Sequence, residues 1–325
     1  MRGKLAKMFT KNEHLLILNK FDSDTQAAAE YSARSGVPIS KQIVRYWRNV
    51  VLVNEGNQPK ADEALREEPG RALRKPSPDE DLGLYPDLAS TVYNCILHIP
   101  DQHAPYQHPD ALRFLTAVKA AFPIDLVVNA GDELDYHALS FHDADPNLDS
   151  AGAELEKGKL FLQELEGIFP VQLICGSNHG SMVFRKAKHH GIPVQMIKSY
   201  REVIFPDRIS GIGWSWADEW VVKTPMGDVL FKHSSSGILA DAAHNRCNLL
   251  VGHSHGLFST EYCASKDYLY WGAYGGCLID KDAYAFAYGK LSKNKPIVGC
   301  TLVLEGRPVQ IPMLLDSSGR WVGHL

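Results

Sequence analysis

Residues 126–135 read LVVNAGDELD, a largely apolar run that ends at a glycine followed by an aspartate. The run has the length and continuity of a strand that is buried on both faces of a sheet. Three other apolar runs also end in a cluster of polar residues, at 92–99, 171–175 and 248–251. Helical patterns lie between these runs, at 110–122 and 151–169. This alternation predicts an α/β fold with its chemistry at the carboxyl ends of the strands.

Two later stretches predict paired strands. Residues 214–232 read as two strands around a turn at 225–228, and residues 299–315 as a hairpin around a turn at 305–307. Since the strands of a hairpin run antiparallel, we expect mixed sheets rather than purely parallel ones. The aromatic-rich stretch from Tyr262 to Tyr288 has two interpretations. Its rings stack on nucleic-acid bases, or Tyr268 to Tyr288 form an ordinary hairpin with cross-strand aromatic pairs.

The composition is that of a folded protein. Of 325 residues, 45% are hydrophobic and 22% charged, and this length predicts a large domain with an additional module. The six cysteines are scattered and never spaced as C-x-x-C, which argues against a disulfide framework and a thiolate zinc site. The apolar run at 15–18 is too short for a signal-peptide core or a membrane span, so we expect a cytoplasmic protein.

The first 53 residues differ in charge from the rest of the chain. They carry nine Lys and Arg against four Asp and Glu, in a chain whose net charge is −4. Two helices are predicted around the break at Gly36-Val37-Pro38, the second beginning at Lys41 after Ser40. We therefore predict a helical module over 1–53, a linker over 54–90 that is rich in Pro, Gly and charged residues, and a main domain over 91–325.

This pair of helices resembles the helix-turn-helix of phage and bacterial DNA-binding proteins. The basic residues Lys41, Arg45 and Arg48 of the second helix lie on a different face from its apolar residues. By the resemblance, these three cations are candidates for contact with DNA. The alternative is a helical hairpin used for docking or oligomerisation, with its basic side chains in solvent.

The polar clusters after the strands hold seven residues with oxygen or imidazole donors: Asp101, His103, Asp132, Asn178, His233, His253 and His255. Seven ligands are too many for one tetrahedral zinc ion, and they suit two metal ions that share a bridging carboxylate. Oxygen and nitrogen donors without thiolate favour Mn²⁺, Fe, Zn²⁺ or Mg²⁺.

The order of these motifs resembles the signature of the calcineurin-like metallophosphoesterases. The motifs are D-x-H at 101–103, G-D-x-x-D at 131–135, N-H at 178–179, His233, and G-H-x-H at 252–255. The resemblance implies an αββα sandwich of two mixed sheets and two divalent ions, with Mn²⁺ expected first. It places Asp101, His103, Asp132 and His255 on metal 1, and Asp132, Asn178, His233 and His253 on metal 2. Asp132 bridges the ions, and His179 contacts the phosphoryl oxygen or protonates the leaving group.

The sequence departs from the family pattern at two motifs. Ser177 stands between the glycine and Asn178, and Gly180 replaces the usual acidic residue after His179, so another group must set the His179 tautomer. Tyr136 follows Asp135 where the serine/threonine protein phosphatases carry a phosphate-binding arginine, which disfavours that branch. Asp135 either orients a metal ligand or caps a helix.

The function expected from these features is that of a two-metal phosphodiesterase. With the basic helical module, the resemblance extends to the DNA-repair exonuclease-like members of phages and bacteria, whose substrates are nucleic acids or nucleotides. One alternative is a phosphomonoesterase that acts on small metabolites or phosphoproteins. The other is a metal-stabilised binding or scaffolding protein that has lost catalysis.

Overall fold

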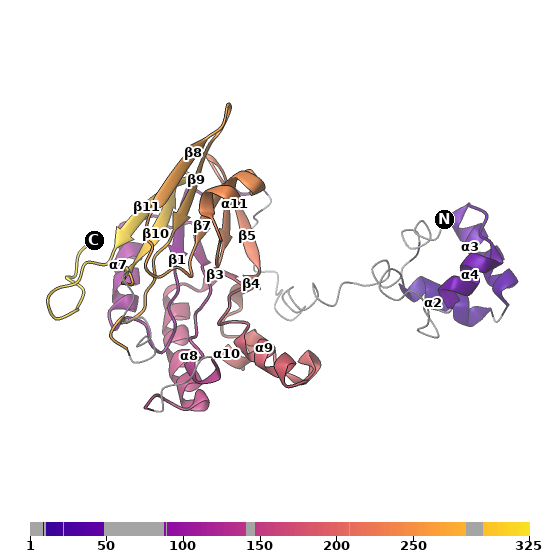
Figure 1. Ribbon diagram of the computed structural model, residues 1–325, viewed down its shortest axis with the longest axis horizontal. Coiled ribbons are helices and arrows are strands. Elements are labelled where there is room, and N and C mark those ends of the chain that lie inside the picture. The colour runs from indigo at the N-terminus through magenta and orange to yellow at the C-terminus, as the bar shows by residue number, and fades with distance from the viewer. Residues whose placement is uncertain are drawn as a thin grey trace. The chain divides into compact units, whose positions relative to one another are not determined.

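The computed structural model describes residues 9, 11–21, 23–48, 88, 90–140, 147–207, 209–283 and 295–325. The chain divides into two units, residues 1–73 and 74–325, which are drawn in Figure 1. The division falls inside the predicted linker. Because residues 49–87 lie outside the described part, the linker limits at 54 and 90 stay predictions.

The described part of the first unit contains three helices, α2 (Lys11–Lys20), α3 (Asp24–Ser35) and α4 (Lys41–Arg48). Helix α3 begins where the side chain of Ser23 accepts the N–H of Thr25, and it ends at Gly36, which adopts the left-handed conformation with φ +66°. Helix α4 begins at Lys41, as predicted. The sequence analysis did not predict α2.

Apolar side chains from all three helices form the core of this unit. Ile17 and Leu18 of α2 pack with Ala27 of α3 and Val44 of α4. Tyr31 is also buried there, and its hydroxyl lies 2.6 Å from Nδ1 of His14. A tyrosine and a histidine on facing helices therefore satisfy each other inside the module.

Two mixed sheets form the second unit. The first has the strand order β11-β10-β1-β2-β3-β4, and the second has the order β5-β6-β7-β9-β8. The first sheet consists of β1 (Cys95–Ile99), β2 (Leu126–Asn129), β3 (Val171–Cys175), β4 (Gly213–Ala217), β10 (Gly299–Leu304) and β11 (Arg307–Pro312). The second consists of β5 (Glu219–Thr224), β6 (Gly227–Lys232), β7 (Asn248–Val251), β8 (Thr260–Ala264) and β9 (Leu269–Tyr274). The strands β1-β2-β3-β4 and β6-β7-β9 pair parallel. Antiparallel pairing occurs at the β10-β11 edge of the first sheet and at both edges of the second.

Helices cover the outer faces of the two sheets. They are α7 (Ala111–Ala121), α8 (Ala151–Ile168), α9 (Met182–His189), α10 (Tyr200–Ile204) and α11 (Ile238–Asn245), with short 3₁₀ helices η2 (His137–Leu139) and η3 (Val194–Met196). Ile96 of β1 joins Phe231 of β6 in a cluster between the sheets, whereas its neighbour Leu97 joins Phe114 of α7 outside the first sheet. Helix α11 packs on β7, β8 and β9, away from α7 (Figure 1). The layers confirm the expected αββα sandwich.

The predicted strands that end in polar clusters are all present, but one stretch differs from the prediction. Residues 214–232 form three strands instead of two, because β4 ends in the first sheet and β5 begins in the second after the single residue Asp218. The hairpin at 299–315 is confirmed as β10 and β11. The aromatic stretch forms a hairpin over 260–274, with Tyr262 opposite Trp271, while residues 284–288 lie outside the described part. Among the described helices, none has the length and apolar character needed to cross a membrane.

Candidate metal centre

The seven predicted ligands lie together at the carboxyl ends of five strands. Asp101 and His103 follow β1, Asp132 follows β2, Asn178 follows β3, His233 follows β6, and His253 and His255 follow β7. In a parallel arrangement the carboxyl ends of neighbouring strands meet at one edge, so two packed sheets bring their loops to a common site. Each of these side chains has a donor atom within 3.6 Å of a donor atom of another.

One group of donors corresponds to the ligand set expected for metal 1. Nε2 of His103 lies 3.1 Å from Nε2 of His255 and 3.5 Å from Oδ2 of Asp132. Nε2 of His255 lies 3.5 Å from Oδ2 of Asp101. Atoms that bind a common ion at about 2.0–2.2 Å are about 3 Å apart, so these spacings fit one divalent ion.

A second group corresponds to the set expected for metal 2. Nε2 of His233 lies 2.6 Å from Oδ1 of Asn178, 3.1 Å from Nδ1 of His253 and 3.2 Å from Oδ2 of Asp132. The donor atoms of Asp132, His233 and His253 all lie within 4.8 Å of one another. Three different side chains therefore converge on one imidazole nitrogen, as expected of residues that surround an ion.

Asp132 faces both groups with the same oxygen. Its Oδ2 is the atom near His103 and also the atom near His233, whereas its Oδ1 accepts the backbone N–H of His179 at 3.0 Å. The carboxylate would thus bridge two ions through one oxygen and hold the His179 loop through the other. Asp132 is only 1% exposed, so this arrangement is shielded from bulk water.

The electrostatics of the site also fit bound cations. Burial raises the pKa of Asp101 to about 7, and its Oδ1 has no hydrogen-bond partner among the described residues. Burial also opposes charge on His233, but the negative charges of Asp132 and Asp101 outweigh this and raise its pKa to about 9. Burial also disfavours the charge of Asp132, but the positive charge of His233 outweighs this and holds the pKa of Asp132 well below its usual range. A divalent metal ion would satisfy these buried acceptors and would supply the positive charge that the cluster attracts.

Asp135 orients two of the site histidines. Its Oδ1 accepts a hydrogen bond from Nδ1 of His103 at 2.5 Å, and its backbone carbonyl accepts one from Nδ1 of His179. Donor atoms of His103, Asp135 and His179 lie within 4.8 Å of one another, but Asp135 contacts the His103 nitrogen that does not face Asp132. It is therefore placed to fix the ring of a ligand rather than to bind the ion itself.

Ser177, the residue that stands between the glycine and Asn178, links two loops of the site. Its Oγ accepts the backbone N–H of Asp132 at 2.9 Å and that of Gly180 at 3.0 Å. Gly131 is needed beside it, because a Cβ at position 131 would lie 2.5 Å from the carbonyl oxygen of Cys175 and 2.7 Å from Cβ of Ser177. The loops after β2 and β3 are thus joined by a hydrogen bond between the Ser177 hydroxyl and the backbone of Asp132.

Three of the seven ligands adopt the left-handed backbone conformation. The φ angles are +51° for His103, +51° for Asp132 and +63° for His253. Residues with a Cβ pay about 1–2 kcal/mol for this conformation. Such strain persists where the surroundings impose it, and it gathers at functional sites.

The three basic candidates of α4 have different surroundings. Nε of Arg48 bonds Asp24, its other nitrogens donate to the carbonyls of Leu18 and Phe21, and the side chain is only 20% exposed. These contacts give Arg48 a structural role inside the helical module. Arg45 is 73% exposed, although it also pairs with Asp24 at 3.2 Å, and Lys41 is exposed. Contact of any of the three with nucleic acid stays a prediction.

The sequence analysis missed a group of basic residues next to the site. Arg185 of α9 donates through Nη2 to the carbonyl of the ligand residue Asn178 at 2.8 Å. The signal was present in the composition, because no Asp or Glu occurs anywhere between Gly167 and Arg201.

No protein-family model matches the sequence, and no curated protein matches it. Among solved structures, the chain is similar to Vps29 of Chaetomium thermophilum at 13% identity and a TM-score of 0.35, over 71% of this chain and 93% of that one. It is similar to an archaeal phosphodiesterase at 12% identity and a TM-score of 0.36, over 67% and 99%. It is also similar to Vacuolar Protein Sorting 29 from Cryptosporidium parvum at 15% identity and a TM-score of 0.35, over 68% and 97%.

Proposed function

We propose that this chain is a two-metal phosphodiesterase of the calcineurin-like metallophosphoesterase family. The observation that carries the proposal is the position of Asp132, whose Oδ2 faces a His103 group on one side and a His233 group on the other. The donor set is oxygen and imidazole only, which suits Mn²⁺, Fe, Zn²⁺ or Mg²⁺, and we propose Mn²⁺ as the first ion to test. When bound, two such ions supply Lewis acidity that activates water and stabilises charge on a phosphoryl group.

His179 is the residue of this chain that would handle the proton of the leaving group. Because its Nδ1 donates to the carbonyl of Asp135, its Nε2 remains available for a substrate oxygen. The carboxylate oxygen Oδ1 of Asp135 lies 3.7 Å from the same ring nitrogen, Nδ1 of His179. The side chain is 21% exposed, so a substrate can reach it from solvent and it can protonate a departing alkoxide.

For the substrate, we propose a phosphate diester of a nucleic acid or a nucleotide. Support comes from the helical module, in which Lys41 and Arg45 are exposed on α4, and from the basic residues of α9 beside the ligand Asn178. A positively charged surface attracts phosphate backbones and raises the rate of encounter.

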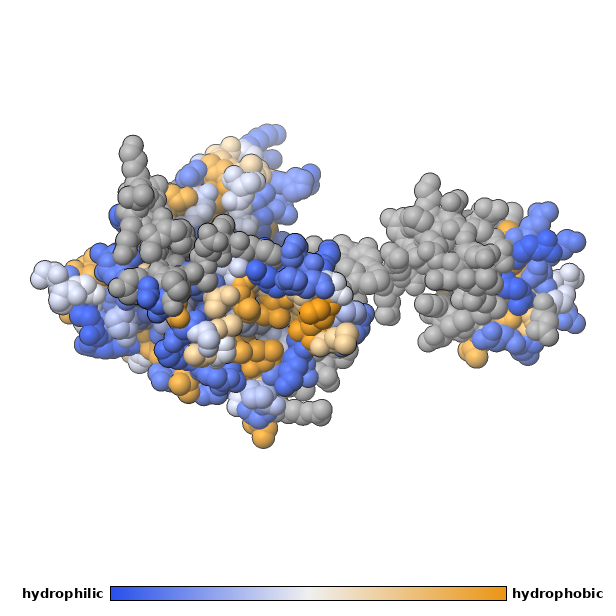
Figure 2. All heavy atoms as spheres, turned by 60° about the horizontal axis from the view of Figure 1, so that its bottom comes forward, coloured by the Kyte–Doolittle hydropathy of each residue, from blue (hydrophilic) through white to orange (hydrophobic). Residues whose placement is uncertain are grey.

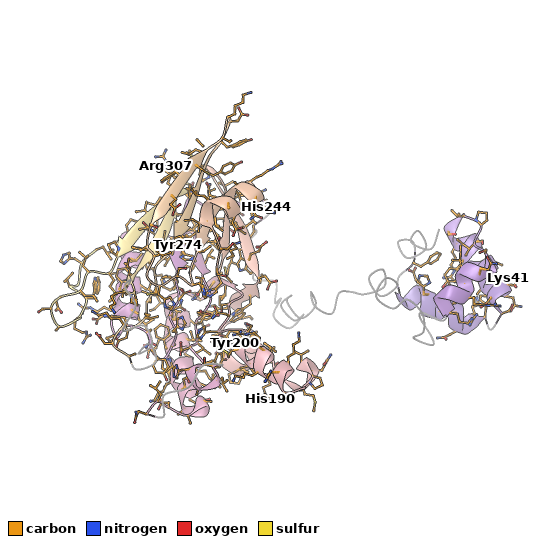
Figure 3. All side chains as sticks on the ribbon, in the orientation of Figure 1. Lys41, His190, Tyr200, His244, Tyr274 and Arg307 are labelled. Carbon is orange, nitrogen blue, oxygen red and sulfur yellow. The ribbon has the colours of Figure 1, made fainter. Side chains whose placement is uncertain are left out.

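The test is an activity panel on metal-reconstituted protein. Bis(p-nitrophenyl) phosphate, p-nitrophenyl phosphate, a cyclic nucleotide and a DNA oligonucleotide are compared with wild type, His179→Ala and His244→Ala. His244 is an exposed histidine on α11 and serves as the matched control (Figure 3).

We expect hydrolysis of diesters, a loss of about 10²–10⁴-fold in kcat for His179→Ala with both ions retained, and no loss for His244→Ala. Hydrolysis of the monoester alone would contradict the proposed substrate class. Absence of any hydrolysis, with two ions bound, would favour a binding or scaffolding protein.

A further inference from the structure

A basic segment follows directly on the metal centre. Residues 167–201 contain five Lys and Arg and no Asp or Glu, although the whole chain has a net charge of −4. The five are Arg185, Lys186, Lys188, Lys198 and Arg201, and His189 and His190 lie among them. One member has a structural explanation, since Arg201 is buried and donates to the carbonyls of Ser210 and Gly211. The other four basic residues lie within 182–198, which we call the basic segment.

The basic segment is attached to a metal ligand. Helix α9 begins four residues after Asn178, and both Arg185 and Ser181 donate to the Asn178 carbonyl, at 2.8 and 3.2 Å. From there the helix runs for eight residues, about 12 Å, to His190 (Figure 3). Arg185 and Lys188 are three residues apart and share a face of the helix. Arg185 and Lys188 therefore form a row of cations on α9 that begins beside the predicted metal ligand Asn178.

The basic segment is open to solvent. Arg185, Lys188 and Lys198 are exposed. Within the described part of the chain, neither Lys188 nor Lys198 forms an ion pair with a carboxylate. Like charges in a row repel one another, and a polyanion relieves that repulsion.

We infer that the basic segment binds the phosphodiester backbone of a nucleic-acid strand whose scissile phosphate lies at the metal centre. The inference rests on the proposed function and makes it more specific, since a mononucleotide or cyclic nucleotide would not reach Lys188 or Lys198. Arg185, which donates to the carbonyl of Asn178, is the member of the basic segment that comes first after a ligand, and its planar guanidinium suits a phosphate. The lysines bind phosphates farther along the strand as point charges.

An anionic membrane surface is the competing partner. Met196 is 78% exposed and Ile192 47% exposed in the same segment, and Figure 2 shows apolar side chains gathered among hydrophilic ones on the side that carries the lower helices of Figure 1. The nucleic-acid interpretation is favoured because the row of cations begins beside the metal centre, where we propose that a phosphate ester binds. Vesicles are therefore one arm of the test.

The test measures how salt weakens binding of a fluorescein-labelled single-stranded phosphorothioate 20-mer, which resists hydrolysis, to the metal-loaded full chain. Every protein carries Lys41→Gln and Arg45→Gln, so that the cations of α4 do not contribute. The test variant adds Lys188→Gln with Lys198→Gln. The control adds Lys266→Gln with Lys281→Gln, two exposed lysines outside the basic segment that give the same change in charge.

Each phosphate contact on a single strand contributes about 0.7 to the slope of log K against log salt. Losing two contacts should lower the magnitude of the slope by about 1.4, which corresponds to about 25-fold weaker binding at 0.1 M salt relative to 1 M. The control pair should leave the slope unchanged, and Lys188→Arg with Lys198→Arg should restore it.

Equal effects of the test and control pairs would overturn the inference, because the segment would then act only through net charge. An unchanged slope together with weaker binding to phosphatidylserine vesicles would overturn it in favour of a membrane. Neither result depends on turnover. An inactive protein with the expected slope would refute the proposed function alone, and an active diesterase with an unchanged slope would refute this inference alone.

Discussion

Removing the carboxylate of Asp135 should weaken one metal site and spare the other. Its Oδ1 holds Nδ1 of His103, whose Nε2 belongs to the first ligand group, whereas among the described residues no hydrogen bond joins Asp135 to His233 or Asn178 of the second. Loss of a carboxylate that orients a histidine ligand costs about 10–100-fold in metal affinity, or about 1.4–2.8 kcal/mol. We expect Asp135→Ala to lose about that much at metal 1. Asp135→Asn should lose less, because its amide oxygen still accepts the His103 proton.

The assay is a titration of metal bound per chain against free Mn²⁺ at pH 7. Wild type should bind two ions over a similar range of free metal, and Asp135→Ala should bind one ion normally and the other only at 10–100-fold higher concentration. Asp125→Asn is the control, since that carboxylate accepts the N–H groups of Asn94 and Cys95 at the opposite end of β1. Equal weakening of both ions, or none, would refute the assignment of Asp135 to one site.

Three further changes test other parts of the structure. Asp132→Asn should reduce the metal content at both sites, and elemental analysis that still finds two ions per chain would contradict the bridging oxygen. Arg48→Ala should destabilise the helical module by about 2 kcal/mol, because a charged donor to a carboxylate and two carbonyls is lost; faster hydrogen exchange confined to residues 11–48 of the full chain would show this. The guanidinium of Arg320 holds the pKa of Asp110 well below its usual range. The stabilisation that this ion pair gives the folded protein is therefore complete above about pH 4 and is lost as pH falls further. Urea unfolding of Asp110→Asn should therefore depend less on pH between 2 and 5 than that of wild type, and parallel profiles would exclude this role.

The elements that could be predicted from the sequence are those whose signal is local. Strands buried on both faces are continuous apolar runs, and this is why β3 and β7 were predicted at their observed bounds. That the seven candidate donors lie close together could be predicted because most of them come directly after such a run. Helix α2 was missed because its apolar run at 15–18 is short. Its burial depends on contacts with α3 and α4, which the sequence does not show.

Other features depend on contacts between distant residues, which a single sequence does not reveal. The change of sheet between β4 and β5 occurs at one residue, Asp218, and leaves no break in the pattern. The two alternatives for Asp135 could be separated only by the contact of its Oδ1 with His103, 32 residues away. The tautomer of His179 depends on a backbone carbonyl, a group that every residue possesses.

The extra serine of the third motif should prove as important as a metal ligand, although it contacts no ion. Ser177→Ala removes the hydroxyl that accepts the N–H groups of Asp132 and Gly180 in partly buried surroundings. Each unpaired donor costs about 1–3 kcal/mol, and the left-handed backbone of Asp132, at φ +51°, loses a contact that stabilises it. We expect a lower melting temperature and weaker binding of both ions, because Asp132 serves both. Ser181→Ala is the matched control, since its Oγ makes one 3.2 Å bond to Asn178, and equal losses in the two variants would show that Ser177 has no special role.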